Sequence, residues 1–171
     1  MKFFSLVVLL VSSLMAANNG VYVGFDVGSN RISMDSGNTH IATDNSGMQT
    51  VKIGYNINYN NRIAIFYQHI NLSDGNGYSY GVNYDYLFSL MKQTKLFVGA
   101  SFGHSNLAYN DTVQDMKGLI YGGEFGLLYD LNKYFSLEVG YRAYKSNVDS
   151  SDTNIKVNNI QNWYAGLNYQ F

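Results

Sequence analysis

The sequence predicts an all-β protein, an eight-stranded antiparallel up-and-down transmembrane β-barrel preceded by a cleavable signal peptide. Three observations predict this class. From Gly20 onward, apolar residues alternate with small or polar residues at a period of two, in eight segments of the 171-residue chain. Only 13% of the residues are charged and 16% are aromatic, whereas about 25% of a typical soluble domain is charged. Proline is absent, which suits a closed ladder that needs nearly every backbone N–H.

Composition also excludes several classes of function. The net charge of −1 gives no electrostatic footprint for nucleic acid. The absence of cysteine removes disulfide frameworks, thiolate zinc sites and cysteine nucleophiles. The three histidines are scattered, so we expect no metal site, and no fingerprint for a phosphate or cofactor is present.

The first segment has the features of a secretory signal peptide. Lys2 precedes an apolar run from Phe3 to Leu14, and the small residues Ala16 and Ala17 follow it. The run is too short to span a membrane. We therefore expect a signal peptide at 1–17 and one barrel domain at 18–171.

The first four predicted strands each have a face of large apolar residues. The segment 78–88 is the clearest, whereas 62–71 segregates less well because Ala64 and Phe66 fall on its second face. The apolar faces are Val21, Val23, Phe25 and Val27 in 20–29; Val51, Ile53, Tyr55, Ile57 and Tyr59 in 48–59; Ile63, Ile65 and Tyr67 in 62–71; and Tyr78, Tyr80, Val82, Tyr84, Tyr86 and Phe88 in 78–88.

The last four predicted strands repeat this pattern. Their apolar faces are Leu96, Val98, Ala100 and Phe102 in 95–105; Leu119, Tyr121, Phe125, Leu127 and Tyr129 in 118–129; Phe135, Leu137, Val139, Tyr141 and Ala143 in 135–145; and Trp163, Ala165, Leu167, Tyr169 and Phe171 in 158–171. Segments of about ten residues have the length that a tilted strand needs to cross a bilayer.

The second face of these strands consists of glycine, Ser, Asn, Gln and a few charges. Such a face is too small and too polar for a water-facing exterior, and it suits the narrow interior of an eight-stranded barrel. The alternative is a soluble barrel with its apolar face around a ligand. The many tyrosines on the apolar face and the few charges on the other argue against that alternative.

Long and short connections mostly alternate along the chain. The long loops are expected at 30–47, 72–77, 106–116 and 147–157, and they are rich in Ser, Asn, Asp, Thr and Gly. Outer-membrane barrels have short periplasmic turns and longer outside loops. We therefore expect both termini in the periplasm, and an extracellular ligand, if there is one, at loops 30–47, 106–116 and 147–157.

The end of the chain carries a motif that points to a family. The run from Trp163 to Phe171 has a final aromatic residue, with Tyr169 two before it and Leu167 at the next alternate position. This run resembles the C-terminal assembly signal of OmpA/OmpX-type small outer-membrane β-barrels. The resemblance implies the outer membrane of a Gram-negative cell, recognition by the barrel-assembly machinery, and contact with outer-membrane lipid and lipopolysaccharide. Because the chain ends at Phe171, we expect the barrel alone, without a peptidoglycan-binding domain.

The charged residues of the second face form the first candidate site. Counting residues across a turn centred at 132 places Glu124 opposite residue 140, so that Glu138 and Arg142 flank it. Lys52, Asp26 and Asp85 lie at middle depth on the inward faces of other predicted strands. The predicted interior network is Asp26, Lys52, Asp85, Glu124, Glu138 and Arg142. It is interpreted as a structural plug, with a charge gate in a narrow pore as the alternative.

The histidines form the second candidate site. Residue counting places His69 and His104 beside Tyr80, as a belt at one membrane interface. The run Gly103-His104-Ser105 also resembles lipid A deacylases of the same barrel size. Neighbouring residues of a strand point to opposite faces, so His104 cannot serve Ser105 as a base. We expect a monomeric, non-enzymatic barrel without cofactors, with a structural or surface-interaction role; a porin-like channel is the alternative, and a lipid A-modifying enzyme is a remote one.

Overall fold

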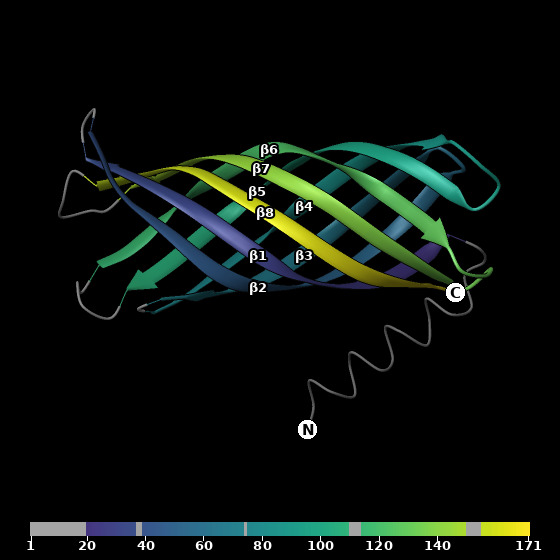
Figure 1. Cartoon of the computed structure of the whole chain (residues 1–171), viewed down its shortest axis with the longest axis horizontal. Coiled ribbons are helices and arrows are strands. Elements are labelled where there is room, and N and C mark those ends of the chain that lie inside the picture. The colour runs from purple at the N-terminus through teal and green to yellow at the C-terminus, as the bar shows by residue number, and fades with distance from the viewer. Residues whose placement is uncertain (1–19, 37–38, 74, 110–113, 150–154) are drawn as a thin grey trace, which may run out of the picture.

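The computed structural model describes residues 20–36, 39–73, 75–109, 114–149 and 155–171, and these residues form eight antiparallel strands in one closed barrel (Figure 1). The predicted signal peptide at 1–17 lies outside the described residues. Each strand pairs with its sequence neighbours, and β1 closes the barrel on β8. The strands are β1 Val21–Ser36, β2 Thr39–Asn58, β3 Asn61–Leu72, β4 Gly75–Ser89, β5 Thr94–Tyr109, β6 Gln114–Asp130, β7 Phe135–Asp149 and β8 Ile155–Gln170. The predicted fold class is confirmed.

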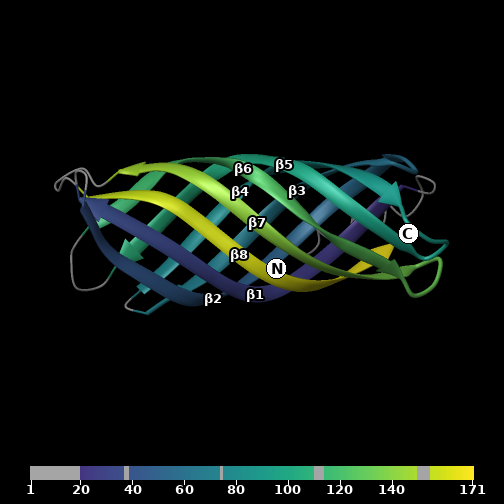
Figure 2. The ribbon, with the colours of Figure 1, turned by 45° about the horizontal axis from the view of Figure 1, so that its top comes forward.

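The two ends of the barrel differ. At one end, here called the terminal end, the chain enters β1 and leaves β8, and short turns at 59–60, 90–93 and 131–134 join the strands. The backbone N–H of Phe171 donates to the Val21 carbonyl oxygen at 3.1 Å, which ties the two termini together. The opposite end, at which β1, β3, β5 and β7 finish, is called the loop end. Figure 2 shows the strong tilt of the strands between these ends.

Side chains alternate between the inside and the outside of the barrel, as the period of two predicts. The outer face carries most of the large exposed apolar residues, such as Ile65, Phe102 and Phe125. The inner face carries buried polar and charged residues over the middle of the barrel. Among the described residues, no helix is long and apolar enough to cross a membrane.

The strands are longer than the sequence predicts, and the expected loops are therefore mostly wrong. Most residues of 30–47, 72–77, 106–116 and 147–157 belong to strands; Asn30, for example, pairs with Ser46. The residues 37–38, 74, 110–113 and 150–154 of these loops lie outside the described part of the chain. The ladder continues because strand pairing does not depend on the membrane: a polar outer face can meet water while the inner face stays packed.

The hydrophobic pattern inverts where the strands extend beyond their predicted ends. Nearer the terminal end, the outer face is apolar and the inner face is mixed. Its buried charges lie with a small apolar cluster of Met48, Leu87, Phe97, Leu128 and Tyr164. Toward the loop end, the inner positions become apolar and the outer positions become polar. Ile32, Ile70 and Leu107 are completely buried inside the barrel, whereas Arg31 and Asn71, their chain neighbours, are exposed outside. The barrel interior therefore acquires a hydrophobic core at the loop end.

Candidate functional site

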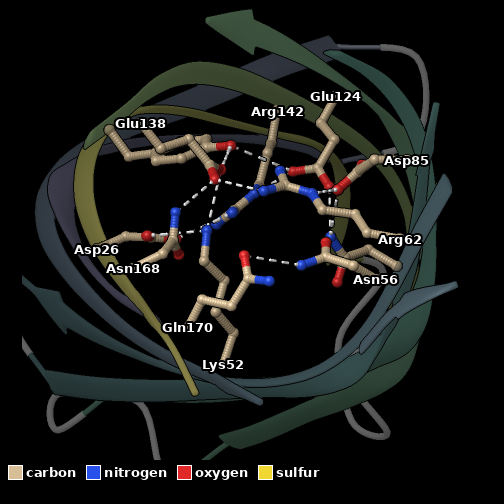
Figure 3. A network of polar contacts seen from close by, with 12 residues as sticks. Asp26, Lys52, Asn56, Arg62, Asp85, Glu124, Glu138, Arg142, Asn168 and Gln170 are labelled. Atoms are coloured by element: carbon tan, nitrogen blue, oxygen red, sulfur yellow. Dashed lines mark hydrogen bonds and ion pairs between the residues drawn. The ribbon is translucent and has the colours of Figure 1, made fainter. Parts of the chain in front are cut away.

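Seven charged side chains meet inside the barrel at middle depth, and all are buried (Figure 3). The structure brings together all six residues that the sequence placed there and adds Arg62 from β3. The ion network, as the set is called below, consists of Asp26 (β1), Lys52 (β2), Arg62 (β3), Asp85 (β4), Glu124 (β6), and Glu138 and Arg142 (β7).

One half of the ion network is built around Asp26. Lys52 Nζ lies 3.1 Å from Asp26 Oδ1 and 2.9 Å from Glu138 Oε1. Arg142 Nη2 lies 3.0 Å from Asp26 Oδ2. Asp26 therefore has a separate cation at each carboxylate oxygen. One of these cations, Lys52, is shared with Glu138.

The other half is built around Arg62 and Arg142. Arg62 donates from Nε to Asp85 Oδ2 at 2.6 Å and from Nη1 to Glu138 Oε2 at 2.8 Å. Arg142 donates from Nε to Glu124 Oε2 at 2.5 Å. Each arginine bonds two carboxylates on different strands. Arg62 links β3 to β7 across the barrel, whereas Arg142 links β7 to β6 and β1 on the same side.

Neutral side chains complete the network. Glu138 also accepts hydrogen bonds from the Tyr164 hydroxyl at 2.9 Å and from Asn168 Nδ2 at 3.1 Å. The Tyr164 ring lies 3.8 Å below the Arg142 guanidinium, and it lies over Gly140, where a Cβ would approach the Tyr164 hydroxyl oxygen to 2.6 Å. Buried charges need such partners, since water is no longer available to them.

The sequence reasoning missed Arg62 because strand register could not be read at that position. Alternation already placed Arg62 on the inner face of its strand. In the structure Arg62 pairs with Asp85 across β3 and β4. That pairing would have placed Arg62 in the network, but the weak alternation of 62–71 made the register of this strand unpredictable. Ala64 and Phe66 are both buried inside the barrel, so the inner face of β3 is itself apolar.

Two predicted registers are wrong by two residues. Glu124 pairs with Arg142, not with residue 140, because the β6–β7 turn is centred at 133 and Asp130 pairs with Ser136. The side chain of Asn132 holds this turn by accepting from the backbone N–H of Tyr134 at 2.8 Å. Likewise His69 pairs with Tyr78 rather than with Tyr80. A turn position shifted by one residue moves the pairing by two, which the sequence alone does not reveal.

A hydrophobic core closes the barrel on the loop side of the ion network. Ile32, Ile70, Leu107 and Val157 have no exposed surface at all. The loop-end core consists of Ile32, Ile70, Leu72, Leu107, Met116, Ile120, Tyr144, Val157 and Ile160. Because these side chains come from six strands, they fill the barrel from wall to wall.

A cavity of about 590 Å³ opens on the other side, at the terminal end. Its rim carries the ion pair of Lys95 and Asp130, 3.0 Å apart. Its wall includes Tyr22, and it reaches inward as far as Arg62 of the ion network. Below it is called the vestibule.

The comparison with protein families decides the class of this barrel. The profile described as "Outer membrane protein beta-barrel domain" matches residues 4–171. The chain belongs to this outer-membrane β-barrel family. The resemblance that the C-terminal run suggested is thereby confirmed, and so is the assignment to the outer membrane.

Solved structures of other small outer-membrane barrels are similar over 90% of this chain and 100% of their own. Neisserial surface protein A (NspA) is 18% identical with a TM-score of 0.71. Outer membrane protein H (OprH) from P. aeruginosa is 26% identical with a TM-score of 0.63, and the N-terminal barrel of Pseudomonas aeruginosa OprF is 16% identical with a TM-score of 0.57. At their identities, NspA and OprF show the fold alone. No curated protein matches the chain.

In an outer-membrane barrel the apolar outer face contacts lipid, and aromatic residues mark its edges. Tyr80 pairs with His104 at the loop-side edge, with ring centroids 5.8 Å apart, and Tyr67 stacks on Tyr78 at 6.3 Å. His69 lies on the same outer face, beside Tyr78. The three predicted belt residues therefore lie together near one edge of the apolar surface, with Tyr78 between His69 and the Tyr80–His104 pair.

Ser105 points away from His104, as alternation requires. It is buried inside the barrel and bonds the Ser79 hydroxyl at 2.9 Å. Within the described residues, no three of His, Asp and Glu converge in a way that could hold a metal ion. The arrangement offers no nucleophile and base within reach of each other.

The predicted assembly residues form an outward aromatic ridge on β8. Trp163 is 63% exposed and contacts Tyr141, with ring centroids 4.7 Å apart. Leu167 is exposed between this pair and the chain end. Tyr169 meets the Phe171 ring edge-on at 4.9 Å. These side chains are accessible from the membrane side of the barrel.

Proposed function

We propose that this protein is a closed, non-conducting outer-membrane barrel that acts at the cell surface through its loop end. In this arrangement the loop end faces outward, and both termini and the short turns lie in the periplasm. The protein works as a monomer with no enzymatic role, and lipopolysaccharide surrounds its outer half. The barrel-assembly machinery inserts it by way of the ridge that ends at Phe171.

The filled interior is the observation that carries this proposal. The ion network occupies the middle of the barrel, and the loop-end core lies above it with Ile32, Ile70 and Leu107 completely buried. The interior of an eight-stranded barrel is just wide enough for side chains to fill it. An ion crossing the barrel would have to displace a dry layer of apolar side chains and a network of paired charges.

The outer face at the loop end supports a surface role. Beyond the aromatic belt this face is polar, with Arg31 and Asn45 exposed as a pair on β1 and β2 and Lys145 exposed on β7. Strands of 15 to 20 residues in β1, β2 and β4–β8 exceed the 9–11 residues or so that cross a bilayer. The excess raises a rigid, water-facing wall above the membrane, on which a partner can dock.

A binding screen tests the surface role. Cells that carry the protein and cells that lack it are compared for attachment to immobilised glycans, matrix proteins and serum proteins. We expect one class of ligand to bind only the carrier cells, and to bind less after Arg31→Ala and Lys145→Ala. Lys92→Ala, at a terminal-end turn, is the matched control and should leave binding unchanged. Equal binding by both kinds of cell across the screen would contradict the surface role.

The second candidate is a narrow channel, and the vestibule is the observation that favours it. This cavity admits water from the terminal end to Arg62, so the charged residues could act as a gate. Proteoliposome swelling in small sugars and amino acids distinguishes the two functions. The closed-barrel proposal expects swelling at the rate of empty liposomes, both for the wild type and for Glu124→Ala. Faster swelling that Glu124→Ala or Arg142→Ala alters would favour the channel.

A further inference from the structure

The buried charges of the ion network do not balance. Three of the buried residues are cations, Lys52, Arg62 and Arg142, and four are carboxylic acids, Asp26, Asp85, Glu124 and Glu138. The charged pair at the vestibule rim, Lys95 with Asp130, is internally neutral. With every group ionised, the described interior would hold one unmatched negative charge. An unmatched charge away from water is strongly disfavoured.

Two of the four carboxyl groups meet each other. Asp85 on β4 and Glu124 on β6 both pair with Gly99 on the intervening strand β5. A Cβ at Gly99 would collide with Asp85 Oδ1. Because Gly99 has no side chain, the two carboxyl groups can approach each other above it. Asn83 Nδ2 donates to both carboxyl groups, to Glu124 Oε1 at 2.6 Å and to Asp85 Oδ2 at 3.4 Å, and so holds them near each other. Two ionised carboxylates are both acceptors, so a hydrogen bond between them needs a proton on one of the two.

One oxygen of this pair has no donor. Asp85 Oδ2 accepts from Arg62, but Asp85 Oδ1 is fully buried without a hydrogen-bond partner. Both oxygens of Glu124 have hydrogen-bond donors, since one accepts from Arg142 and the other accepts from Asn83 at 2.6 Å. Asp26 offers a contrast, because its own Oδ1 faces the Lys52 ammonium at 3.1 Å. A proton on Asp85 Oδ1 would turn this oxygen from an unpaired acceptor into a donor to Glu124, and it would remove the excess charge.

We propose that Asp85 and Glu124 form a proton-binding site, in which Asp85 stays protonated at neutral pH and donates a hydrogen bond to Glu124. The protein thus folds around a carboxylic acid–carboxylate pair. Gly99 makes the space for the pair, and the remaining three carboxylates match the three cations. Charged and titratable groups face the pair from four strands: Tyr22 from β1, Arg62 from β3, Glu138, Arg142 and Tyr144 from β7, and Tyr164 from β8. Asp26 is joined to the pair through Arg142, and Lys52 is joined to it through Glu138.

The first test is infrared spectroscopy of the refolded protein in detergent at neutral pH. We expect the C=O stretch of a protonated carboxylic acid in the wild type. Asp85→Asn should abolish this band, and so should Glu124→Gln, because each substitution removes the fourth acid. Asp130→Asn changes an acid at the vestibule rim, outside the ion network, and is the control that should keep the band. Absence of the band in the wild type, or its survival in both Asp85→Asn and Glu124→Gln, would overturn the proposal.

The second test is denaturant unfolding as a function of pH. The folded chain holds a proton that the unfolded chain gives up to water, so stability falls as pH rises. Between the pH at which a free aspartate ionises, about 4, and the pH at which Asp85 ionises in the folded protein, the unfolding constant of the wild type rises up to about tenfold per pH unit. The amide of Asp85→Asn mimics the neutral acid without having to bind a proton, so this variant should be about as stable as the wild type at mildly acidic pH. It should lose the decline and should therefore be more stable than the wild type at neutral pH.

The pattern of variants keeps the test decisive. Asp26→Asn removes an ionised partner of two cations and should raise the unfolding constant about a hundredfold or more. Asp85→Asn and Glu124→Gln each leave three cations with three carboxylates, so at least one should fold nearly as well as the wild type. The double variant leaves a cation unmatched and should be destabilised beyond the sum of its parts. Losses for both single variants as large as that of Asp26→Asn would refute the proton-binding site.

Discussion

Arg142 lies directly opposite Glu124 across β6 and β7, and its guanidinium joins Glu124 at 2.5 Å to Asp26 at 3.0 Å. This one side chain therefore links β7 to both β6 and β1. Removing one partner of a buried ion pair leaves the others without compensation. Loss of any one of these interior charges should therefore destabilise the closed barrel.

The first prediction concerns this linkage. Arg142→Met should reduce the free energy of unfolding by about 3–5 kcal/mol, because Asp26 and Glu124 each lose a buried cation. Urea unfolding in detergent, followed by tryptophan fluorescence, measures the change. Lys145→Met, on the outside of the same strand, is the control and should stay within about 0.5 kcal/mol of the wild type. Equal stability of the two variants would contradict the role given to Arg142.

The second prediction concerns the loop-end core. Ile70 is completely buried on the inner face of β3, whereas Ile65 is 59% exposed on the outer face of the same strand. Ile70→Ala should cost about 2–5 kcal/mol, because it leaves a cavity in a packed layer. Ile65→Ala should cost less than half as much, since detergent or lipid fills the space it leaves. Similar losses for both variants would show that the loop end is not tightly packed.

The inversion of the hydrophobic pattern explains how far the sequence could predict this fold. Period-two alternation gives eight strands, their order and the inner position of the charged residues, because each strand reveals its own faces. The strand ends were missed because Ile32, Ile70 and Leu107 put apolar residues on the face that is polar in the middle of the barrel. A loop and an inverted strand then have similar compositions.

Contacts between side chains of different strands could not be predicted from the sequence, for a different reason. Arg62 meets Glu138, 76 residues away, and such a contact depends on the register of several successive strands. A shift of one residue in a turn moves every pairing across it by two, as happened for Glu124. Six of the seven charged residues of the network were therefore predictable, whereas Arg62, the partners of each residue, and the meeting of Asp85 with Glu124 over Gly99 were not.

The third prediction concerns orientation in the membrane. The chain has no cysteine, so in a single-cysteine variant any label on this protein must be at the introduced residue. In intact cells, a membrane-impermeant maleimide should label Asn71→Cys at the loop end and should not label Lys92→Cys at a terminal-end turn. Lysed cells, in which both variants should react, provide the control. Labelling of Lys92→Cys alone in intact cells would reverse the proposed orientation.

The fourth prediction concerns assembly. Deletion of Phe171 should lower the amount of folded protein in the outer membrane severalfold while leaving the detergent-refolded barrel intact, because Phe171 extends past β8 and lies on its surface. Heat-modifiable migration on detergent gels measures the folded fraction in both settings. Phe135→Ala, which removes an exposed aromatic ring at the same end of the barrel, is the comparison. Normal membrane yield without Phe171 would argue against an assembly signal there.

Single-channel recording from the refolded wild-type protein in a planar bilayer tests the central claim most directly. The account predicts a flat baseline at neutral pH, because the loop-end core and the ion network fill the barrel from wall to wall. Stepwise currents whose size changes in Glu124→Ala or Arg142→Ala would contradict it and would make this barrel a channel.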